Sequence, residues 1–534
     1  MKTESQPQSQ DWLGHFGVWF GIIFCLKWRT LSEPPVWDSV VGLFPAASTL
    51  ADTGFNLREL LQQPIFLHGG SNTHAESVVT WLIAILFWLF GKGPSTLVLL
   101  HVLNFALAAW TLSKLFRLAV QFMDRIVAWM LCAVVLFCPL FHVQAGAIYL
   151  EIPMALCTVS AVAAYSNGQL GRALFWGALA TWIKQPGIIV LGALSAAALL
   201  RSGPLFQRFR QAATFAILGL LIVSLPLLES PLMGNLSGYS GTKWNGLWDW
   251  FQRRPLFYLK TIPDVFGVCV VFALGGLFRF RDILISLKGL SDLDLIPVGD
   301  QRSPQCETTS AIRTPCAVGV SWVLLLMFFL LYFVVPFVTQ LYILALPRYA
   351  VSIFPCVLLG MVYGLSTWTS ARVTKVALGV LMLFFLVNRN GDFYPAYRGN
   401  DLSVHERSGA YRQLVDQQRA AMRTVSRLPD DATIYYGLLE YFMMQHPWMG
   451  YAERQHPGGR CVAMTQEQPK STTREDLPSN FFVVLDRRGF WGERFLKSLL
   501  QDADADPTRQ VLHYRRFQQG QFVVDIYEVR PAAE

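Results

Sequence analysis

Two acidic residues stand at the mouths of apolar segments of membrane length, and each could act as a base. Asp38 follows Pro34-Pro35 after the first such segment, and Glu151 opens a later one. An ionised carboxylate in hydrocarbon costs roughly 2.5–3.5 kcal/mol at a helix centre, so a polar site is one reason to keep both. A carboxylate within hydrogen-bond reach of a hydroxyl or amine can take its proton. Helix capping is the structural alternative for Asp38, and complementing a positive helix end is the alternative for Glu151.

Two cations occupy comparable places and suit a phosphate. Lys184 lies in Lys184-Gln185-Pro186-Gly187, which breaks a 28-residue apolar run from 173 to 200. The N–H groups after Pro186 would add to an anion site there. Arg348, with Tyr349, leads into a late apolar segment, and its guanidinium can hold a phosphate through two bonds. The alternatives are snorkelling for Lys184 and an interfacial anchor for Arg348.

Weaker candidates for substrate contact lie in two predicted loops. Lys243 and Trp244 combine a cation with an aromatic face, which suits a sugar or lipid headgroup and equally an interfacial belt. His68 and His74 flank Gly69-Gly70-Ser71-Asn72, where each is more simply a hydrogen-bonded loop residue. No phosphate-binding loop, dinucleotide fingerprint, nucleophile elbow or metal-ligand spacing is present.

The elements that must position these residues are apolar helices. The chain has 534 residues, of which 53% are hydrophobic and only 15% charged, and this indicates a polytopic membrane protein. Its net charge of +8 comes mainly from short loops between apolar segments, so no nucleic-acid partner is expected. We predict eleven membrane spans, near 12–28, 97–116, 126–144, 152–166, 173–183, 186–200, 211–228, 262–278, 317–338, 349–367 and 374–388. The further apolar stretch Val78–Phe90 is predicted to be an interfacial helix.

The basic loops fix the predicted orientation. Cytoplasmic loops of membrane proteins are enriched in Lys and Arg, and a cytoplasmic N-terminus makes most basic loops agree. The two acids and two cations then face the outer side. Residues 1–390 are predicted to form the all-α membrane domain, with a first outer loop at 29–96. Residues 391–534 are predicted to form a small extracytoplasmic α/β domain, with a helix within 404–427 and strands near 433–438, 481–485, 510–517 and 521–527.

In this order the motifs resemble those of the GT-C superfamily of integral-membrane glycosyltransferases. The resemblance is to the bacterial branch related to protein O-mannosyltransferases and lipid A aminoarabinose transferases. It rests on the first-loop acid Asp38, the interfacial helix ending in Trp88-Leu89-Phe90-Gly91, Glu151-Ile152-Pro153-Met154, the Lys184 break and the Arg348-Tyr349 pair. It covers roughly residues 10–390 and is strongest over 30–190.

The resemblance implies an inverting transfer of a hexosyl or pentosyl group from a polyprenyl-phosphate donor at the outer face of a bacterial inner membrane. It implies Asp38 as base, Glu151 as second acid, and Lys184 and Arg348 as contacts of the lipid phosphate. The acceptor would be a glycan, lipid or protein. No cofactor is implied, and a divalent ion bridging the acids is left open. Ser39 replaces the Glu that commonly follows the first acid, and Glu151 replaces the more usual Asp.

Two other classes of protein compete with this interpretation. A transporter or lipid flippase would predict inverted repeats and charges near the membrane midplane, whereas this sequence has no convincing repeat. A non-catalytic scaffold presenting the C-terminal domain would leave Asp38 and Glu151 freely replaceable.

Overall fold

The computed structural model describes residues 11–36, 39–56, 59, 77–200, 204–229, 318–327, 347–388, 411–461, 477–486, 493–519 and 522–532. The chain is mostly helical with one small sheet, as predicted. It clusters into two compact units. The first holds Met1–Trp28, Leu103–Pro395 and Glu406–Ser408, and the second holds Arg29–Val102, Ala396–His405 and Gly409–Glu534.

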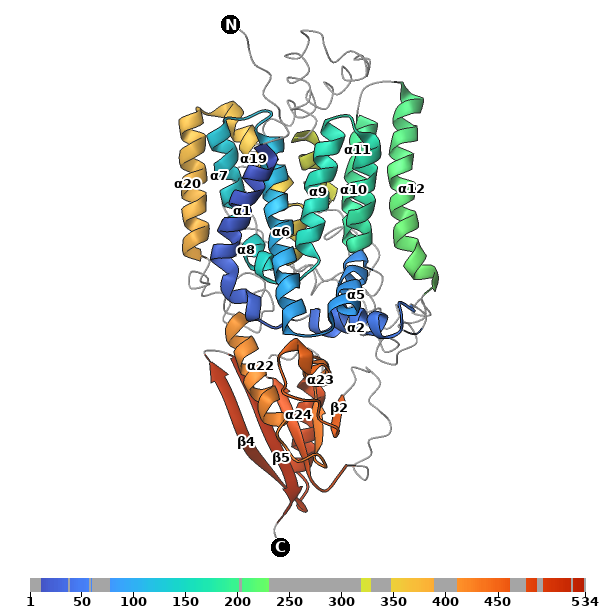
Figure 1. Ribbon diagram of the computed structural model, residues 1–534, viewed down its shortest axis with the longest axis vertical. Helices are drawn as coiled ribbons and strands as arrows, with labels where there is room; N and C mark the ends of the chain where they lie inside the picture. The colour runs from blue at the N-terminus through green and yellow to red at the C-terminus, as the bar shows by residue number, and fades with distance from the viewer. Residues whose placement is uncertain are drawn as a thin grey trace. The chain divides into compact units, whose positions relative to one another are not determined.

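The first unit is built from helices that fall on the predicted apolar segments, and α9, α10 and α11 run side by side within it (Figure 1). Helix α6 begins in the second unit and lies mostly in the first. The described helices of the first unit are α1 (Asp11–Lys27), α6 (Pro94–Ala119), α7 (Arg125–Phe137), α8 (Pro139–Gly146), α9 (Glu151–Ser166), α10 (Leu170–Ile183), α11 (Ile188–Leu200), α12 (Leu205–Glu229), α19 (Phe354–Trp368) and α20 (Ala371–Asn388), with short 3-10 turns η4 (Gln185–Gly187) and η8 (Pro347–Ser352). A further apolar helix is described at Val318–Met327. The predicted span 262–278 and most of 317–338 lie outside the described residues.

One predicted span is bent in the structure. The segment 126–144 is not one helix, because α7 ends at Phe137 and α8 begins at Pro139 with a bend of 67°. Pro139 lacks the N–H that would continue α7, and a proline is well placed in the first turn of α8. The bend therefore follows from Pro139, a single residue that an average of hydropathy over the whole segment does not reveal.

Among the described helices, α6 alone is long and apolar enough to cross a membrane by itself, and α7 with α8 makes a second if that bent pair is one span. Several other described helices are apolar but shorter, among them α5 (Val78–Phe90) and α9. The number of spans and their orientation stay predictions.

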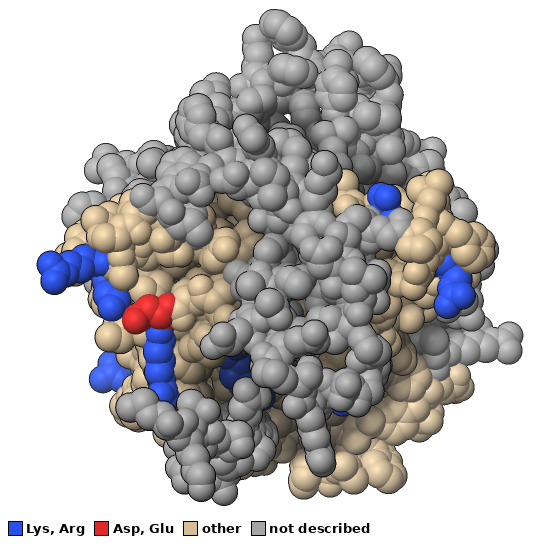
Figure 2. All heavy atoms as spheres, turned by 90° about the horizontal axis from the view of Figure 1, so that it is seen from above, with Lys and Arg blue, Asp and Glu red and all other residues tan. Residues whose placement is uncertain are grey.

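Helix ends on one face of the molecule carry the basic residues that led to the predicted orientation. Figure 2 shows Lys and Arg side chains on both sides of this face, with acidic side chains gathered at one place. Asp124 caps α7 by accepting bonds from the backbone N–H of Ile126 and Val127, at 2.9 and 3.3 Å. Its carboxylate also lies 3.3 Å from Lys375 Nζ at the start of α20. The hydrogen bond to Lys375 lowers the pKa of Asp124, so this cap stays ionised at neutral pH.

The second unit contains the five-stranded sheet. Its strands are β1 (Thr433–Tyr436), β2 (Gly459–Cys461), β3 (Phe481–Asp486), β4 (Arg509–Gln519) and β5 (Phe522–Pro531), in the order β2-β1-β3-β5-β4. Strands β2, β1 and β3 are parallel, whereas β5 and β4 form an antiparallel hairpin added to β3. Strands β1, β3, β4 and β5 fall on the segments predicted as strands, whereas β2 was not predicted.

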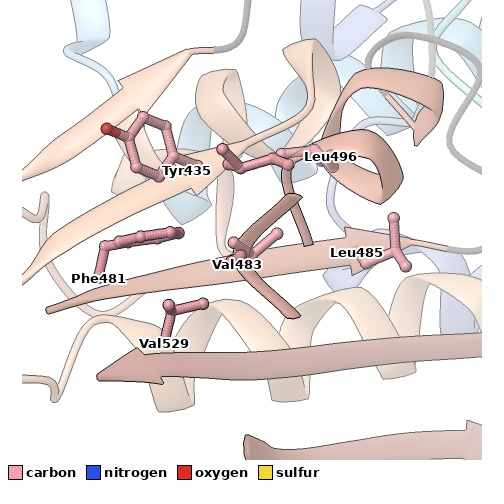
Figure 3. Packing of buried hydrophobic residues seen from close by; sticks show 8 residues of the cluster. Tyr435, Phe481, Val483, Leu485, Leu496 and Val529 are labelled. Atoms are coloured by element: carbon pink, nitrogen blue, oxygen red, sulfur yellow. The ribbon is translucent and has the colours of Figure 1, made fainter. Parts of the chain in front are cut away.

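Two helices cover this sheet and supply its core. Helix α24 (Glu493–Asp504) packs against β3 and β4, and α22 (Tyr411–Val425) packs against β4 and β5. Figure 3 shows Tyr435, Phe481 and Val483 packed with Leu496 of α24 and Val529 of β5. The short helix α23 (Leu438–Gln445) follows β1.

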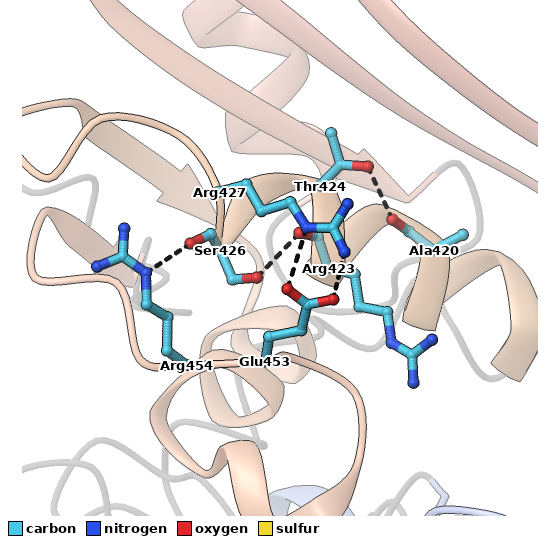
Figure 4. A network of polar contacts seen from close by, with 7 residues as sticks. All are labelled: Ala420, Arg423, Thr424, Ser426, Arg427, Glu453 and Arg454. Carbon is cyan, nitrogen blue, oxygen red and sulfur yellow. Dashed lines mark hydrogen bonds and ion pairs between the residues drawn. The ribbon is translucent and has the colours of Figure 1, made fainter.

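A polar network orders the end of α22 (Figure 4). Arg427 binds the Glu453 carboxylate through two hydrogen bonds of 3.0 and 2.5 Å, and Arg454 donates to the Ser426 carbonyl at 2.9 Å. The hydrogen bond from Arg427 lowers the pKa of Glu453. Because both partners are exposed, the network fixes local geometry more than it stabilises the module.

The rest of the second unit comes from the region predicted as the first outer loop. It contributes η1 (Trp28–Ser32), a short π-helix η2 (Ser39–Leu43), α2 (Phe44–Asp52) and α5. Helix α5 occupies the stretch predicted as an interfacial helix, and Ser77 caps it by accepting a bond from Val79 N at 3.3 Å. The domain boundary predicted near residue 390 stays a prediction, because residues 389–410 lie outside the described part.

Candidate functional site

Glu151 and Lys184, flagged separately in the sequence, form a buried ion pair in the first unit. Lys184 Nζ lies 2.7 Å from Glu151 Oε1, and the two side chains are 7% and 1% exposed. Removing two charges from water is costly, and only close mutual pairing recovers the loss. Pairing therefore offsets part of the desolvation free energy of both the carboxylate and the ammonium group inside the helical unit.

The break between α10 and α11 places Lys184. Its backbone is extended, with φ −156° and ψ 135°, and Pro186 opens a single 3-10 turn before α11 resumes at Ile188. Gly187 lies against the preceding helix so closely that a Cβ there would approach Ala180 O to 2.1 Å. The Lys184-Gln185-Pro186-Gly187 motif thus folds back on α10, and α10 packs along α9, whose first residue is Glu151.

Asn104, a polar residue within the apolar helix α6, holds the segment that leads to Glu151. Its side-chain amide N lies 3.0, 3.0 and 2.8 Å from the carbonyl oxygens of Gln144, Ala145 and Ala147. The Asn104 side chain is buried, so these bonds are made away from water. The carbonyls lie at the end of α8 and just beyond it, and Asn104 thereby sets where the linker to Glu151 starts.

Gln144 is a buried polar residue that the sequence analysis missed. It is fully buried on α8, and neither its amide nitrogen nor its amide oxygen has a hydrogen-bond partner among the described residues. Buried side-chain amides are nearly always bonded, so an exception calls for an explanation. The signal was present in the sequence, since Gln144 and Asn104 are both amides inside apolar segments.

The 3-10 turn η8 brings a further predicted segment to this place. Its backbone packs against α8 and α9, the two helices that carry Gln144 and Glu151. Arg348 and Tyr349 belong to this turn, and their side chains lie outside the described part of the structure. The described backbone therefore joins the η8 segment to the Glu151 region, and the roles of both side chains stay predictions.

The remaining predicted site residues lie outside the described residues: Asp38, His68, His74, Lys243 and Trp244. The nearest described residues on either side of Asp38, Val36 and Ser39, belong to the second unit. In the described ranges no group of three or more His, Cys, Asp or Glu side chains is arranged to hold a metal ion.

No protein-family model and no curated protein matches the sequence. Among solved structures, the chain is similar to ArnT from Cupriavidus metallidurans in the apo state, with 14% identity, a TM-score of 0.43 and coverage of 98% of both chains. It is also similar to the same protein bound to undecaprenyl phosphate, with 11% identity, a TM-score of 0.42 and coverage of 97% and 98%. Both structures are of ArnT, which is a member of the family branch that the sequence motifs resemble. At this identity and TM-score the chemistry of ArnT does not carry over, and the function is argued from this chain's own residues.

A double-mutant cycle on the buried pair separates its structural role from a functional one. Glu151→Gln or Lys184→Met alone leaves a buried charge without its partner, and we expect each to lower the free energy of unfolding by about 3–5 kcal/mol. The double variant leaves neither charge and is expected to recover most of that stability. Thermal unfolding of the purified proteins measures both.

Sugar transfer by the same variants then decides the role of the pair. We expect the double variant to be stable and inactive. A stable double variant with wild-type transfer would make the pair structural only.

Proposed function

We propose that this protein is a membrane glycosyltransferase that moves a hexosyl or pentosyl group, with inversion, from a polyprenyl-phosphate donor to an acceptor at the outer face of the membrane. The buried Glu151–Lys184 pair at a helix break is the observation that carries the proposal. A helical core gains little stability from a buried ion pair that apolar residues could replace. Use of the charges by a substrate is a better reason to keep them.

The chemistry of the pair suits a lipid phosphate. In the structure Glu151 neutralises Lys184. A phosphate monoester or diester is an alternative anion for the ammonium group, so donor binding would let Lys184 share or exchange its carboxylate partner. Arg348, on the turn that packs against α8 and α9, is the second proposed phosphate contact. Gln144 would supply an amide to a sugar hydroxyl or phosphate oxygen.

The reaction is a single displacement. Asp38 takes the proton of an acceptor hydroxyl or amine, whose oxygen or nitrogen forms a bond to the anomeric carbon. The bond from that carbon to the phosphate oxygen breaks, and the electron pair leaves with the phosphate. This leaving group needs no proton, because its conjugate acid is strong. Lys184 and Arg348 stabilise the charge that it gains.

The proposal also includes the partners and the setting. The acceptor is a glycan, lipid or protein, and His68, His74, Lys243, Trp244 and Tyr349 are proposed substrate contacts. The protein is placed in a bacterial inner membrane, with a cytoplasmic N-terminus and an extracytoplasmic C-terminal domain. No resident metal is required, because a single carboxylate base suffices.

Asp38→Asn tests the proposed base. In proteoliposomes with labelled polyprenyl-phosphate sugars and an acceptor-lipid extract, we expect the variant to lose about 10²–10⁴-fold in transfer rate, the usual contribution of a general base. Asp52→Asn is the matched control, since Asp52 is an exposed carboxylate that pairs with Lys92. The control should transfer at the wild-type rate.

Equal transfer by wild type and Asp38→Asn would reject Asp38 as the base. Movement of the labelled donor across the bilayer without transfer, in wild type, would instead identify a flippase.

Gln144→Leu is expected to separate stability from activity. Burying an unpaired amide costs about 1–3 kcal/mol, so an apolar side chain of similar size should leave the protein as stable as wild type or more so. Transfer should nevertheless fall, because the amide that contacts the donor is lost. Unfolding temperature and transfer rate are measured together.

Gln418→Leu provides the contrast. Gln418 is a buried amide that donates to Asp486 Oδ2 at 3.0 Å, so its loss should destabilise the protein. A Gln144→Leu variant that loses stability but keeps its activity would contradict a role in binding.

A further inference from the structure

The second unit joins two stretches that lie far apart in the sequence, and Tyr451 makes a direct bond between them. Tyr451 Oη donates a hydrogen bond of 2.8 Å to the carbonyl oxygen of Pro35, across a sequence separation of 416 residues. Both residues are buried. Pro35 is three residues before Asp38.

Two arginines of α22 bind the residues just before Pro35, one through a side chain and one through a backbone carbonyl. Arg412 Nε lies 2.5 Å from Glu33 Oε1. Arg419 donates through Nη2 to Ser32 O at 3.3 Å and through Nε to Gly450 O at 3.1 Å. Arg419 thus links Gly450, the residue before Tyr451, to the segment that Tyr451 binds.

The chain is also held on the far side of Asp38. Residues Ser39–Leu43 form the buried turn η2, which packs against α23. Next along the chain, the ring centroid of Phe44 lies 6.1 Å from that of Trp448. The ring centroid of Phe87, on α5, lies 5.0 Å from that of Trp448. Ser39 N donates to Val36 O at 3.1 Å, which joins the two held flanks across the two intervening residues.

We propose that the C-terminal module, which comprises the five-stranded sheet with α22, α23 and α24, positions the first-loop carboxylate Asp38 for reaction. Tyr451 is the central positioning residue of this module. The inference rests on the proposed function. The contacts above fix the backbone at Pro35, Val36 and Ser39, which are the described residues nearest to Asp38 in the sequence. A misplacement of about 1 Å can reduce a rate about 10²-fold. Burial raises the pKa of the Tyr451 hydroxyl, which therefore remains a donor at ordinary pH.

The C-terminal module thereby has a role in the catalytic step itself. Tyr451 touches no reacting atom in this account, and its effect passes through the backbone of Pro35. Loss of its hydroxyl should therefore lower kcat while the KM for the donor stays nearly constant.

Tyr451→Phe tests this, because it removes one oxygen and leaves the ring. Tyr514→Phe is the matched control, since Tyr514 is a half-exposed tyrosine of the same module, on β4. Both are made in the full-length chain. We expect Tyr451→Phe to lose at least about tenfold in kcat. Hydrogen exchange in the peptide covering residues 33–44 should become faster, and Tyr514→Phe should match wild type in both measurements.

The outcomes distinguish this inference from the proposed function. Wild-type kcat and exchange in Tyr451→Phe, while Asp38→Asn is inactive, would overturn the positioning role alone. If Asp38→Asn transfers normally, the proposed function fails, and unchanged exchange at 33–44 would still overturn the positioning role on its own. Should Tyr451→Phe not fold, Arg412→Gln takes its place, with faster exchange expected and unchanged exchange overturning the inference.

Discussion

Burial of two opposite charges at the break between α10 and α11 is the constraint on which the helical unit depends. Glu151 and Lys184 are 1% and 7% exposed, so neither is tolerated without the other. Their pairing requires the first residue of α9 to meet the break in the next helix pair. Gly187 permits this by bringing the break against Ala180, and Asn104 fixes the carbonyls that precede Glu151. The position of the ion pair therefore depends on three local features: the helix break at Lys184, the small residue Gly187 and the buried amide of Asn104.

The second unit has a buried polar pair of its own, made of two carboxyl groups. Glu440 of α23 is buried, and burial together with the nearby Asp486 raises its pKa to about 8. Asp486 ends β3 and accepts a bond from Gln418 of α22. Holding one proton at neutral pH lets the two carboxyl groups lie in the same interior, and Gln418 ties α22 to the sheet. This module binds the segment from Ser32 to Pro35.

Local pattern was enough to predict most of the elements. The apolar segment 97–116 became α6 (Pro94–Ala119), and the strand expected at 433–438 became β1 (Thr433–Tyr436). Glu151 and Lys184 were each flagged because charge is expensive in an apolar setting. Their pairing was not predictable, since it depends on how α9 packs against α10. Gln144 and Asn104 were overlooked because an average over an apolar segment hides a single amide. The union of residues 32–44 with the C-terminal module left no trace in the sequence, because its contacts span some 400 positions.

Binding of a polyprenyl phosphate by the buried pair is the central claim, and thermal stabilisation of the purified full-length protein tests it most directly. Polyprenyl phosphate without sugar is compared with the matching polyprenol, which lacks the phosphate. A ligand present at 100 times its Kd stabilises the folded state by about 2.7 kcal/mol, enough for a measurable rise in Tm. We predict that the phosphate raises the Tm of the wild type, that the polyprenol does not, and that the Glu151→Gln/Lys184→Met double variant responds to neither. Equal stabilisation of wild type and double variant by the phosphate would contradict the account.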